Sequence, residues 1–136
     1  MPAYLLDSSV AGCLLRRDNK RVLKRLAELT PGDVGISAIT RGELEFAARM
    51  SQWADRDAAA VALLMEHVVV LEYPGEAAEH YGEIREAMHW KEVEMSVPDA
   101  QAAAHARCLG LTLVTERPRE FREAPRLRVE CWSALE

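Results

Sequence analysis

The stretch Tyr4-Leu5-Leu6-Asp7-Ser8-Ser9-Val10 decides the fold of this chain. Its first three residues form an apolar run that is too short for a helix and is typical of a buried strand. Ser8 and Ser9 offer N-cap oxygens to a helix over about residues 10–15. Ligands of α/β folds collect at the carboxyl ends of the strands. We therefore expect Asp7 to lie in a crevice at the end of a buried strand, although a role as a simple helix cap stays open.

Short apolar runs alternate with amphipathic segments along the rest of the chain. Strands are predicted at 34–37, 67–73, 111–115 and 127–131, and helices at 18–29, after 37, and at 53–66, 76–92 and 99–109. Pro98 fits the first turn of the last helix, and Gly110 fits its C-terminal cap. This alternation predicts an α/β fold with a mostly parallel central sheet and helices on both faces.

The composition is that of a single globular domain, which we place over residues 1–136. Of these residues 49% are hydrophobic and 29% are charged. The chain lacks the run of about 18 apolar residues that would cross a bilayer, and it lacks a secretory signal, so we expect a cytoplasmic protein without membrane contact. The three cysteines form no CxxC pair and are expected to be reduced. The net charge of −5 argues against non-specific coating of nucleic acid, but clusters of Arg and Lys leave room for a local site.

Three acidic residues occupy comparable places in this predicted fold. Asp7 ends the first strand, Glu43 lies in the helix after the second, and Asp99 begins the last helix. Because parallel strands place their carboxyl ends on one edge, Asp7 and Glu43 should lie near each other, and Asp99 joins them if its helix N-terminus points that way. Converging carboxylates without a nearby Lys or Arg repel one another, and the usual resolution is a bound hard cation such as Mg²⁺ or Mn²⁺. Such an ion can activate a water and orient in-line attack on a phosphodiester.

The ordered blocks LLDSSV (5–10), ISAITRGEL (36–44), DAQAAAHA (99–106) and LTLVT (111–115) resemble those of the PIN domain, in particular the VapC-type toxins of bacterial type II toxin–antitoxin systems. The segments EAAEHYGEIR (76–85), REF (119–121) and VECW (129–132) are similar to that family as well. The resemblance covers almost the whole chain.

This resemblance implies a three-layer α/β/α sandwich and a metal-dependent endoribonuclease. It also implies a homodimer and a small cognate antitoxin whose tail occupies the active-site groove. Asp7, Glu43 and Asp99 would be the family's acids, holding Mg²⁺ or Mn²⁺, and Ser8 stands where the family has a supporting hydroxyl.

The loop after the fourth strand departs from the family pattern. Where the family commonly has Asp or Asn, two residues after Thr115, this chain has Arg117. Glu116 could take the place of that ligand through a local shift of the loop, enforced by Pro118. Alternatively Arg117, together with Arg119, contacts the RNA backbone.

Two further functions compete with the ribonuclease hypothesis. One is a PIN-like protein that has lost catalysis and only binds RNA or an antitoxin. The other is a phosphatase with Asp7 as its nucleophile, which ranks last because Ser9 stands where such enzymes have a second Asp. His105 lies about 600° around the helix from Asp99, so we expect it to be packed or on the surface rather than a metal ligand.

Overall fold

Five parallel strands form the centre of the molecule in the computed structural model, which describes residues 1–133. The strands are β1 (Tyr4–Leu6), β2 (Val34–Ser37), β3 (Val69–Leu71), β4 (Thr112–Val114) and β5 (Val129–Glu130). Their order in the sheet is β3-β2-β1-β4-β5, and every neighbouring pair is parallel. The prediction of an α/β fold with a parallel sheet is confirmed.

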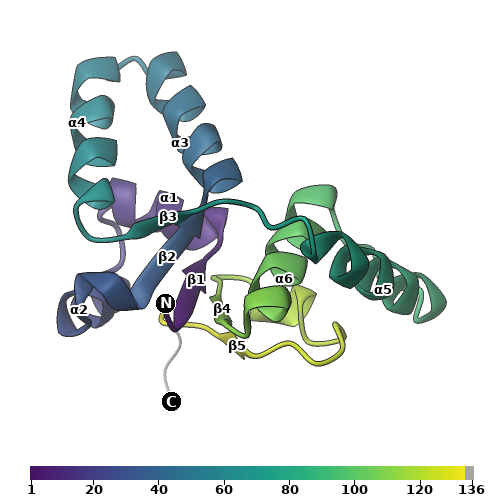
Figure 1. The fold of residues 1–136 in the computed structure, drawn as a ribbon. Helices are drawn as coiled ribbons and strands as arrows, with labels where there is room; N and C mark the ends of the chain where they lie inside the picture. The colour runs from purple at the N-terminus through teal and green to yellow at the C-terminus, as the bar shows by residue number, and fades with distance from the viewer. Residues whose placement is uncertain (134–136) are drawn as a thin grey trace.

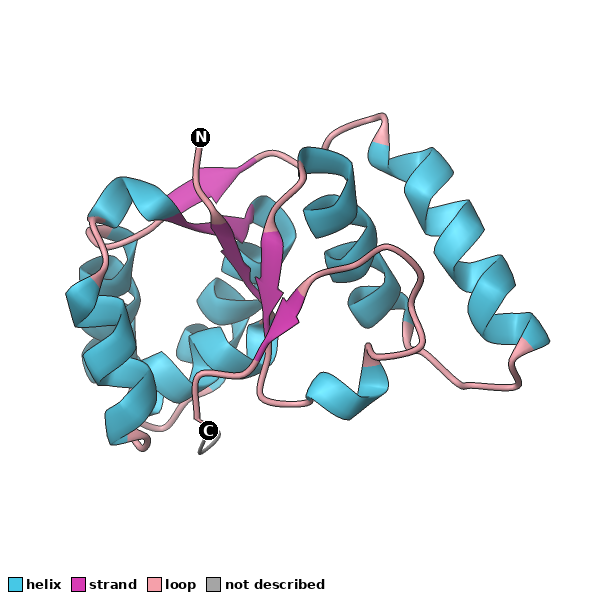
Figure 2. Cartoon of the chain, turned by 90° about the horizontal axis from the view of Figure 1, so that it is seen from below, coloured by secondary structure: helices cyan, strands magenta, loops and turns pink. Residues whose placement is uncertain are grey.

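Helices cover both faces of this sheet (Figure 1). They are α1 (Ser8–Arg16), α2 (Lys20–Glu28), α3 (Ala38–Met50), α4 (Ala54–Met65), α5 (Ala77–Trp90) and α6 (Val97–Leu109), with two short 3-10 helices, η1 (Pro31–Asp33) and η2 (Pro118–Glu120). The view in Figure 2 separates the layers, with α5 and α6 on one side of the strands and the other helices on the opposite side. The arrangement is the predicted three-layer sandwich.

The pleat of the strands divides the core into two halves. Leu6 and Val114 point into the half that is formed with α1, α2, α3 and α4. Leu5 and Leu113, one position earlier on the same strands, point into the half that is formed with α5 and α6. Because successive side chains of a strand face opposite sides, three residues of β1 are enough to contribute to both halves.

The chain reverses its direction of travel across the sheet between β1 and β4. It runs from β1 outward to β2 and β3, and then crosses through α5 and α6 to place β4 on the other side of β1. At such a topological switch point the loops that follow the two strands diverge and leave a crevice. Asp7 follows β1, and residues 115–117 follow β4, so both segments border this crevice.

Capping residues define where the helices that border the crevice begin and end. The Asp7 side chain accepts a hydrogen bond from the backbone N–H of Val10 and caps α1, so the helix begins at Ser8 rather than at about Val10 as predicted. The Ser96 hydroxyl caps α6, and Pro98 occupies its first turn. Gly110 ends α6 in the left-handed region, with φ of 69°.

One predicted strand differs in the structure. The strand predicted at 67–73 is the short edge strand β3, and Val69 on it is 39% exposed, because only β2 pairs with it. No helix within residues 1–133 combines the length and the apolar character needed to span a membrane.

Candidate functional site

Asp7 lies at the carboxyl end of β1 and is only 2% exposed. Its Oδ1 accepts hydrogen bonds from the Ser9 hydroxyl at 2.5 Å and from the Val10 backbone N–H at 3.1 Å. Its Oδ2 is buried and has no hydrogen-bond partner among the described residues. A buried charged oxygen without a partner is costly in free energy, and such atoms are a recurrent sign of a missing ligand.

Asp99 faces Asp7 from the first turn of α6. Its carboxylate accepts two hydrogen bonds from the Arg117 guanidinium, at 2.9 Å to Oδ1 and 3.1 Å to Oδ2. This paired geometry is the strongest form of an Arg–carboxylate contact. The N-terminus of α6 adds a partial positive charge that further favours an anion at this position.

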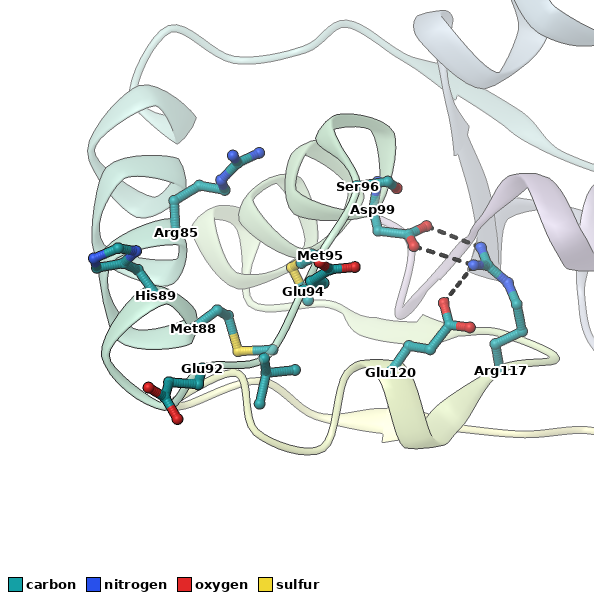
Figure 3. A pocket seen from close by; sticks show the side chains of 11 residues that line it. Arg85, Met88, His89, Glu92, Glu94, Met95, Ser96, Asp99, Arg117 and Glu120 are labelled. Carbon is teal, nitrogen blue, oxygen red and sulfur yellow. Dashed lines mark hydrogen bonds and ion pairs between the residues drawn. The ribbon is translucent and has the colours of Figure 1, made fainter.

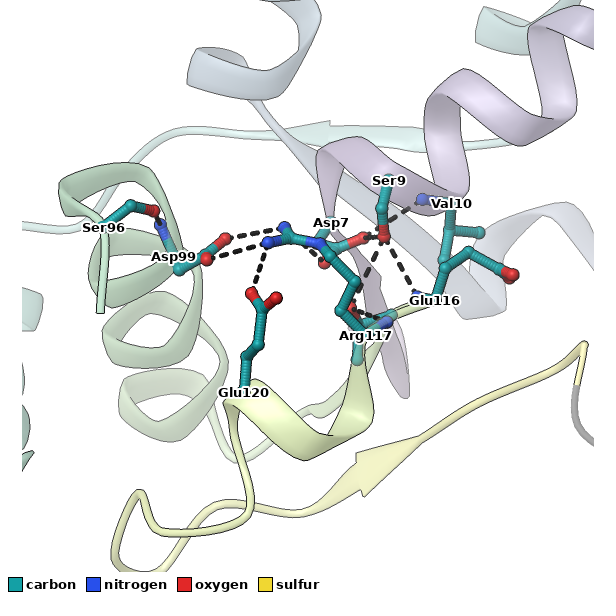
Figure 4. Close-up of polar contacts among 9 residues, drawn as sticks. Asp7, Ser9, Val10, Ser96, Asp99, Glu116, Arg117 and Glu120 are labelled. Atoms are coloured by element: carbon teal, nitrogen blue, oxygen red, sulfur yellow. Dashed lines mark hydrogen bonds and ion pairs between the residues drawn. The ribbon is translucent and has the colours of Figure 1, made fainter. Parts of the chain in front are cut away.

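Arg117 is the cation at the centre of the cluster (Figure 4). Besides Asp99, its guanidinium contacts Glu120 at 2.5 Å and lies 3.9 Å from Asp7 Oδ2. The hydrogen bonds to Asp99, together with the neighbouring carboxylates, raise the pKa of Arg117 above its ordinary value. One permanent cation is thus shared among three acidic side chains.

Ser9 connects the two loops that border the crevice. Its hydroxyl donates to Asp7 and accepts the backbone N–H of Glu116 at 3.0 Å. Thr115 adds to the same network, because its hydroxyl lies 3.4 Å from Ser9 Oγ and accepts the backbone N–H of Arg117 at 3.0 Å. The end of β1 and the loop after β4 are therefore fixed to each other by side-chain oxygens.

Two hollows meet at this cluster. An open groove of about 880 Å³ runs between α5 and η2, and Asp99, Arg117 and Glu120 form one end of its lining (Figure 3). A narrow pocket of about 20 Å³ lies on the side of α3 and is lined by Asp7, Glu43 and Asp99 among other residues. The narrow pocket has room for about one water or one ion.

The residues that were expected to converge do so only in part. Asp7, Glu43 and Asp99 line one pocket, as their positions in the fold predict, and Glu43 is exposed at its rim. Within residues 1–133, however, no three acidic, His or Cys side chains are close enough together to hold a metal ion. Figure 4 shows that the Asp99 carboxylate is turned toward Arg117.

The donors nevertheless suit a hard divalent cation. All three are carboxylates, which are the ligands that Mg²⁺ and Mn²⁺ prefer. The buried Oδ2 of Asp7 makes no hydrogen bond among the described residues, and the adjacent pocket is of the right size for one ion. Asp7, Asp99 and Glu43 could hold such an ion if the Asp99 carboxylate rotated into the pocket.

The remaining predicted site residues lie around this centre. Ser8 lines the narrow pocket. Glu116 points toward α1, away from Arg117 and Asp99, in Figure 4, and its Oε1 is buried without a hydrogen bond among the described residues. Arg119 is an exposed residue of η2. Their roles as supporting hydroxyl, metal ligand and RNA contact stay predictions.

Two residues of the site were not expected from the sequence. Ser9, rather than Ser8, is the serine whose hydroxyl bonds Asp7, and nothing in two adjacent serines distinguishes them before the helix start is known. Glu120 completes the arginine cluster, and its spacing of three residues from Arg117, within a single turn, is the signal that could have found it.

His105 is packed against the back of the narrow pocket. It is fully buried, and the sequence had left open whether it is packed or on the surface. Its ring contacts the Tyr73 ring edge-on at a centroid distance of 5.4 Å. Burial lowers the pKa of His105, so its imidazole is neutral at pH 7. Neither ring nitrogen has a hydrogen-bond partner among the described residues.

A comparison with known families identifies this arrangement. A family model described as the PIN domain matches residues 4–127. The chain belongs to the PIN domain family. The match covers strands β1 to β4 and ends just before β5. It includes every residue of the acidic cluster. The resemblance noted in the sequence is thereby confirmed.

Named relatives of this PIN domain match over nearly its full length. It is 33% identical over 134 residues to the tRNA(fMet)-specific endonuclease VapC of Shigella flexneri, covering 98% of this chain and 100% of that protein. It is 30% identical over 132 residues to ribonuclease VapC2 of Haemophilus influenzae, covering 97% and 99%. The crystal structure of DNA-bound VapBC from Salmonella typhimurium superposes with a TM-score of 0.89 at 31% identity, over 97% of this chain and 99% of that chain.

Proposed function

We propose that this PIN domain is a metal-dependent endoribonuclease and the toxin of a type II toxin–antitoxin pair. One observation carries the proposal: Asp7 and Asp99 lie at the switch point of the sheet and line one pocket with Glu43, and the buried Oδ2 of Asp7 has no hydrogen bond among the described residues, with only the Arg117 guanidinium at 3.9 Å as its ionic partner. Relatives that match the chain nearly from end to end are named ribonuclease or tRNA endonuclease, which agrees with this chemistry.

The roles of the acids follow from their positions. A bound Mg²⁺ or Mn²⁺ would polarise the scissile phosphate and lower the pKa of an attacking water. The Ser9 hydroxyl and the N-terminus of α1 fix Oδ1 of Asp7, so Oδ2 is the oxygen that could bind the metal. Asp99 would bind from the opposite wall. Glu43 is exposed at the rim, where a water that enters from solvent can meet it.

We propose that an extended RNA chain lies in the groove beside the cluster, whose lining also holds the acids Glu92, Glu94, Asp99 and Glu120. The groove is open along its length, and Arg85 and Arg117 lie at its two sides (Figure 3). Arginine matches phosphate geometry through two parallel hydrogen bonds, so these side chains can position a backbone without reading its sequence. We propose Arg117 and the exposed Arg119 as contacts to that backbone.

Exposed apolar side chains on the first helical layer suit protein partners. Phe46 and Met50 of α3 are 66% and 71% exposed, and Trp53, which directly precedes α4, is also exposed. Apolar side chains of this size, gathered on one helical pair, mark a surface that another chain covers. We propose that a cognate antitoxin and a second copy of the toxin are those partners, in keeping with relatives that are solved as VapBC complexes.

RNA cleavage by the purified, antitoxin-free protein tests the proposal. We expect cleavage of a tRNA pool with Mg²⁺ or Mn²⁺, no cleavage with EDTA, and a loss of about 100-fold or more for Asp99→Asn, since a lost metal ligand costs several kcal/mol in the transition state. Asp33→Asn, in η1 and outside the site, is the matched control and should keep full activity. A wild type that stays inactive with either metal, or cleavage that EDTA leaves unchanged, would contradict the proposal.

A further inference from the structure

The Arg117 guanidinium occupies the space where Asp7 and Asp99 approach each other. Its Nη2 lies 2.9 Å from Asp99 Oδ1 and 3.9 Å from Asp7 Oδ2, so a single nitrogen bridges the two carboxylates. Both oxygens of Asp99 are engaged by this one side chain. The positive charge that the two acids require is therefore supplied from within the chain.

The surroundings of Arg117 hold it in this place. Its backbone N–H is bound by the Thr115 hydroxyl, and Pro118 begins η2 directly after it, which limits the loop. Glu120, one turn later, accepts a further hydrogen bond from Nη1, the same nitrogen that donates to Asp99 Oδ2. At the same time the side chain is 39% exposed at the end of the open groove, so it can leave the cluster without disturbing the core.

We propose that Arg117 is a built-in counter-cation that competes with the divalent metal for the Asp99 carboxylate. This role rests on the proposed function and adds a control of metal binding to it. The free protein is held in a form that has a low affinity for the metal. In that form Asp99 faces Arg117, and it must release the guanidinium before it can turn toward the pocket that it shares with Asp7 and Glu43.

Charge and geometry both support competition rather than simultaneous binding. A divalent ion that bound Asp7 Oδ2 would lie within a few ångströms of a guanidinium nitrogen that is itself 3.9 Å from that oxygen. Like charges at such a separation repel each other in a partly buried site, where solvent screens them only in part. Asp99 also cannot keep both of its hydrogen bonds to Arg117 and at the same time turn its oxygens toward the pocket that it shares with Asp7 and Glu43.

A purely structural ion pair makes a different prediction. If Arg117 only stabilised the loop after β4, its removal would lower the stability of the fold and leave the metal affinity unchanged or reduced. Competition predicts that the metal affinity rises, because without the guanidinium the carboxylates of Asp7 and Asp99 have no positive charge beside them. The metal affinity of the free protein therefore separates the two roles without any measurement of cleavage.

The test is the affinity for Mn²⁺ alone, measured by electron paramagnetic resonance or calorimetry on the full chain without RNA. We expect Arg117→Gln to bind Mn²⁺ about tenfold more tightly than wild type or better, in the range typical of coupled sites. Arg117→Lys should gain less affinity, since lysine keeps the charge but not the paired hydrogen bonds. Arg122→Gln is the matched control: it removes an exposed arginine five residues along the chain and should leave the affinity unchanged.

The outcomes separate this inference from the function on which it rests. Equal affinities for wild type and Arg117→Gln, with binding lost in Asp7→Asn, would overturn the competition and leave the metal site standing. No Mn²⁺ binding by any variant would overturn the proposed metal site itself. Far-UV circular dichroism in EDTA establishes folding. Should Arg117→Gln not fold, Arg117→Lys decides the question: an affinity equal to that of wild type would contradict the proposal.

Discussion

The guanidinium of Arg117 binds both carboxylate oxygens of Asp99 across the carboxyl ends of β1 and β4, at 2.9 and 3.1 Å. A cation of the chain itself thus lies among acids that, in this PIN domain, we assign to a metal. The arrangement explains how Asp7 and Asp99 can approach each other in a stable fold without a bound ion. It also makes the occupancy of this site dependent on one side chain that is partly exposed to solvent.

Replacing Ser9 tests the link between the two loops of the crevice. Ser9→Ala removes the hydroxyl that donates to Asp7 and accepts the Glu116 N–H, so Asp7 loses its fixed orientation. We expect cleavage to fall by about 10- to 100-fold, as for residues that orient metal ligands. We also expect the free energy of unfolding in urea to fall by about 1–2 kcal/mol.

Ser8→Ala is the control for that substitution, because Ser8 lines the narrow pocket but is not the serine that bonds Asp7. Its effect on stability should be the smaller of the two. A larger loss of stability for Ser8→Ala than for Ser9→Ala would contradict the network described for the crevice.

Glu43 and Glu45 form a second matched pair on α3. Glu43 is at the rim of the pocket that Asp7 and Asp99 line, whereas Glu45, two residues further along the helix, is not part of that lining. Glu43→Gln should reduce the rate of RNA cleavage about tenfold or more at limiting Mg²⁺, because a carboxylate binds the metal more strongly than an amide. Glu45→Gln should cleave at the wild-type rate. Equal rates for all three proteins would remove Glu43 from the site.

The buried imidazole of His105 makes stability depend on pH. Because burial lowers its pKa, the unfolded chain binds a proton more readily than the folded protein does. Stability from this group is fully present above the unfolded pKa of about 6.5 and is lost as the pH falls below that value. Relative to His105→Leu, the wild type should lose up to about 1.4 kcal/mol per pH unit below pH 6.5. Parallel stability curves from pH 7.5 to 5 would show that His105 does not titrate in this way.

Cys13 should be the least reactive of the three thiols. It is 4% exposed, and burial together with a hydrogen bond to Asp18 raises its pKa to about 12. The reactive thiolate is therefore scarce at pH 8. Native alkylation with iodoacetamide, followed by mass spectrometry, should label the half-buried Cys131 well before Cys13. Cys13 should react only after unfolding, and labelling of both at similar rates would contradict its packing.

The sheet and its helices were largely predictable from the sequence, since apolar runs and helical periodicity determine burial. The strand at 34–37 was predicted with its observed bounds, and Pro98 and Gly110 marked the ends of α6. The edge strand β3 was harder, because a run of valines predicts burial but does not reveal that only one neighbour pairs with it.

The candidate site was predictable in its members more than in its geometry. The parallel strands predicted that Asp7 and Glu43 lie near each other, whereas the place of Asp99 in the same pocket depended on the direction of α6, which the sequence left open. The rotamer of Asp99 could not be predicted, because it depends on where the Arg117 side chain lies in the loop between β4 and η2. Asp7 was considered either a helix cap or a site residue, and the structure shows that it caps α1 through one oxygen and leaves the other unpaired.

The rate of RNA cleavage by Asp7→Asn, relative to wild type at saturating Mn²⁺, tests the central claim most directly. Asparagine keeps an oxygen to cap α1 and to accept the Ser9 hydroxyl, so the fold should be retained while the charge is removed. The account predicts a fall in rate of about 100-fold or more with an unchanged far-UV circular dichroism spectrum. A folded Asp7→Asn that cleaves RNA at the wild-type rate would contradict it.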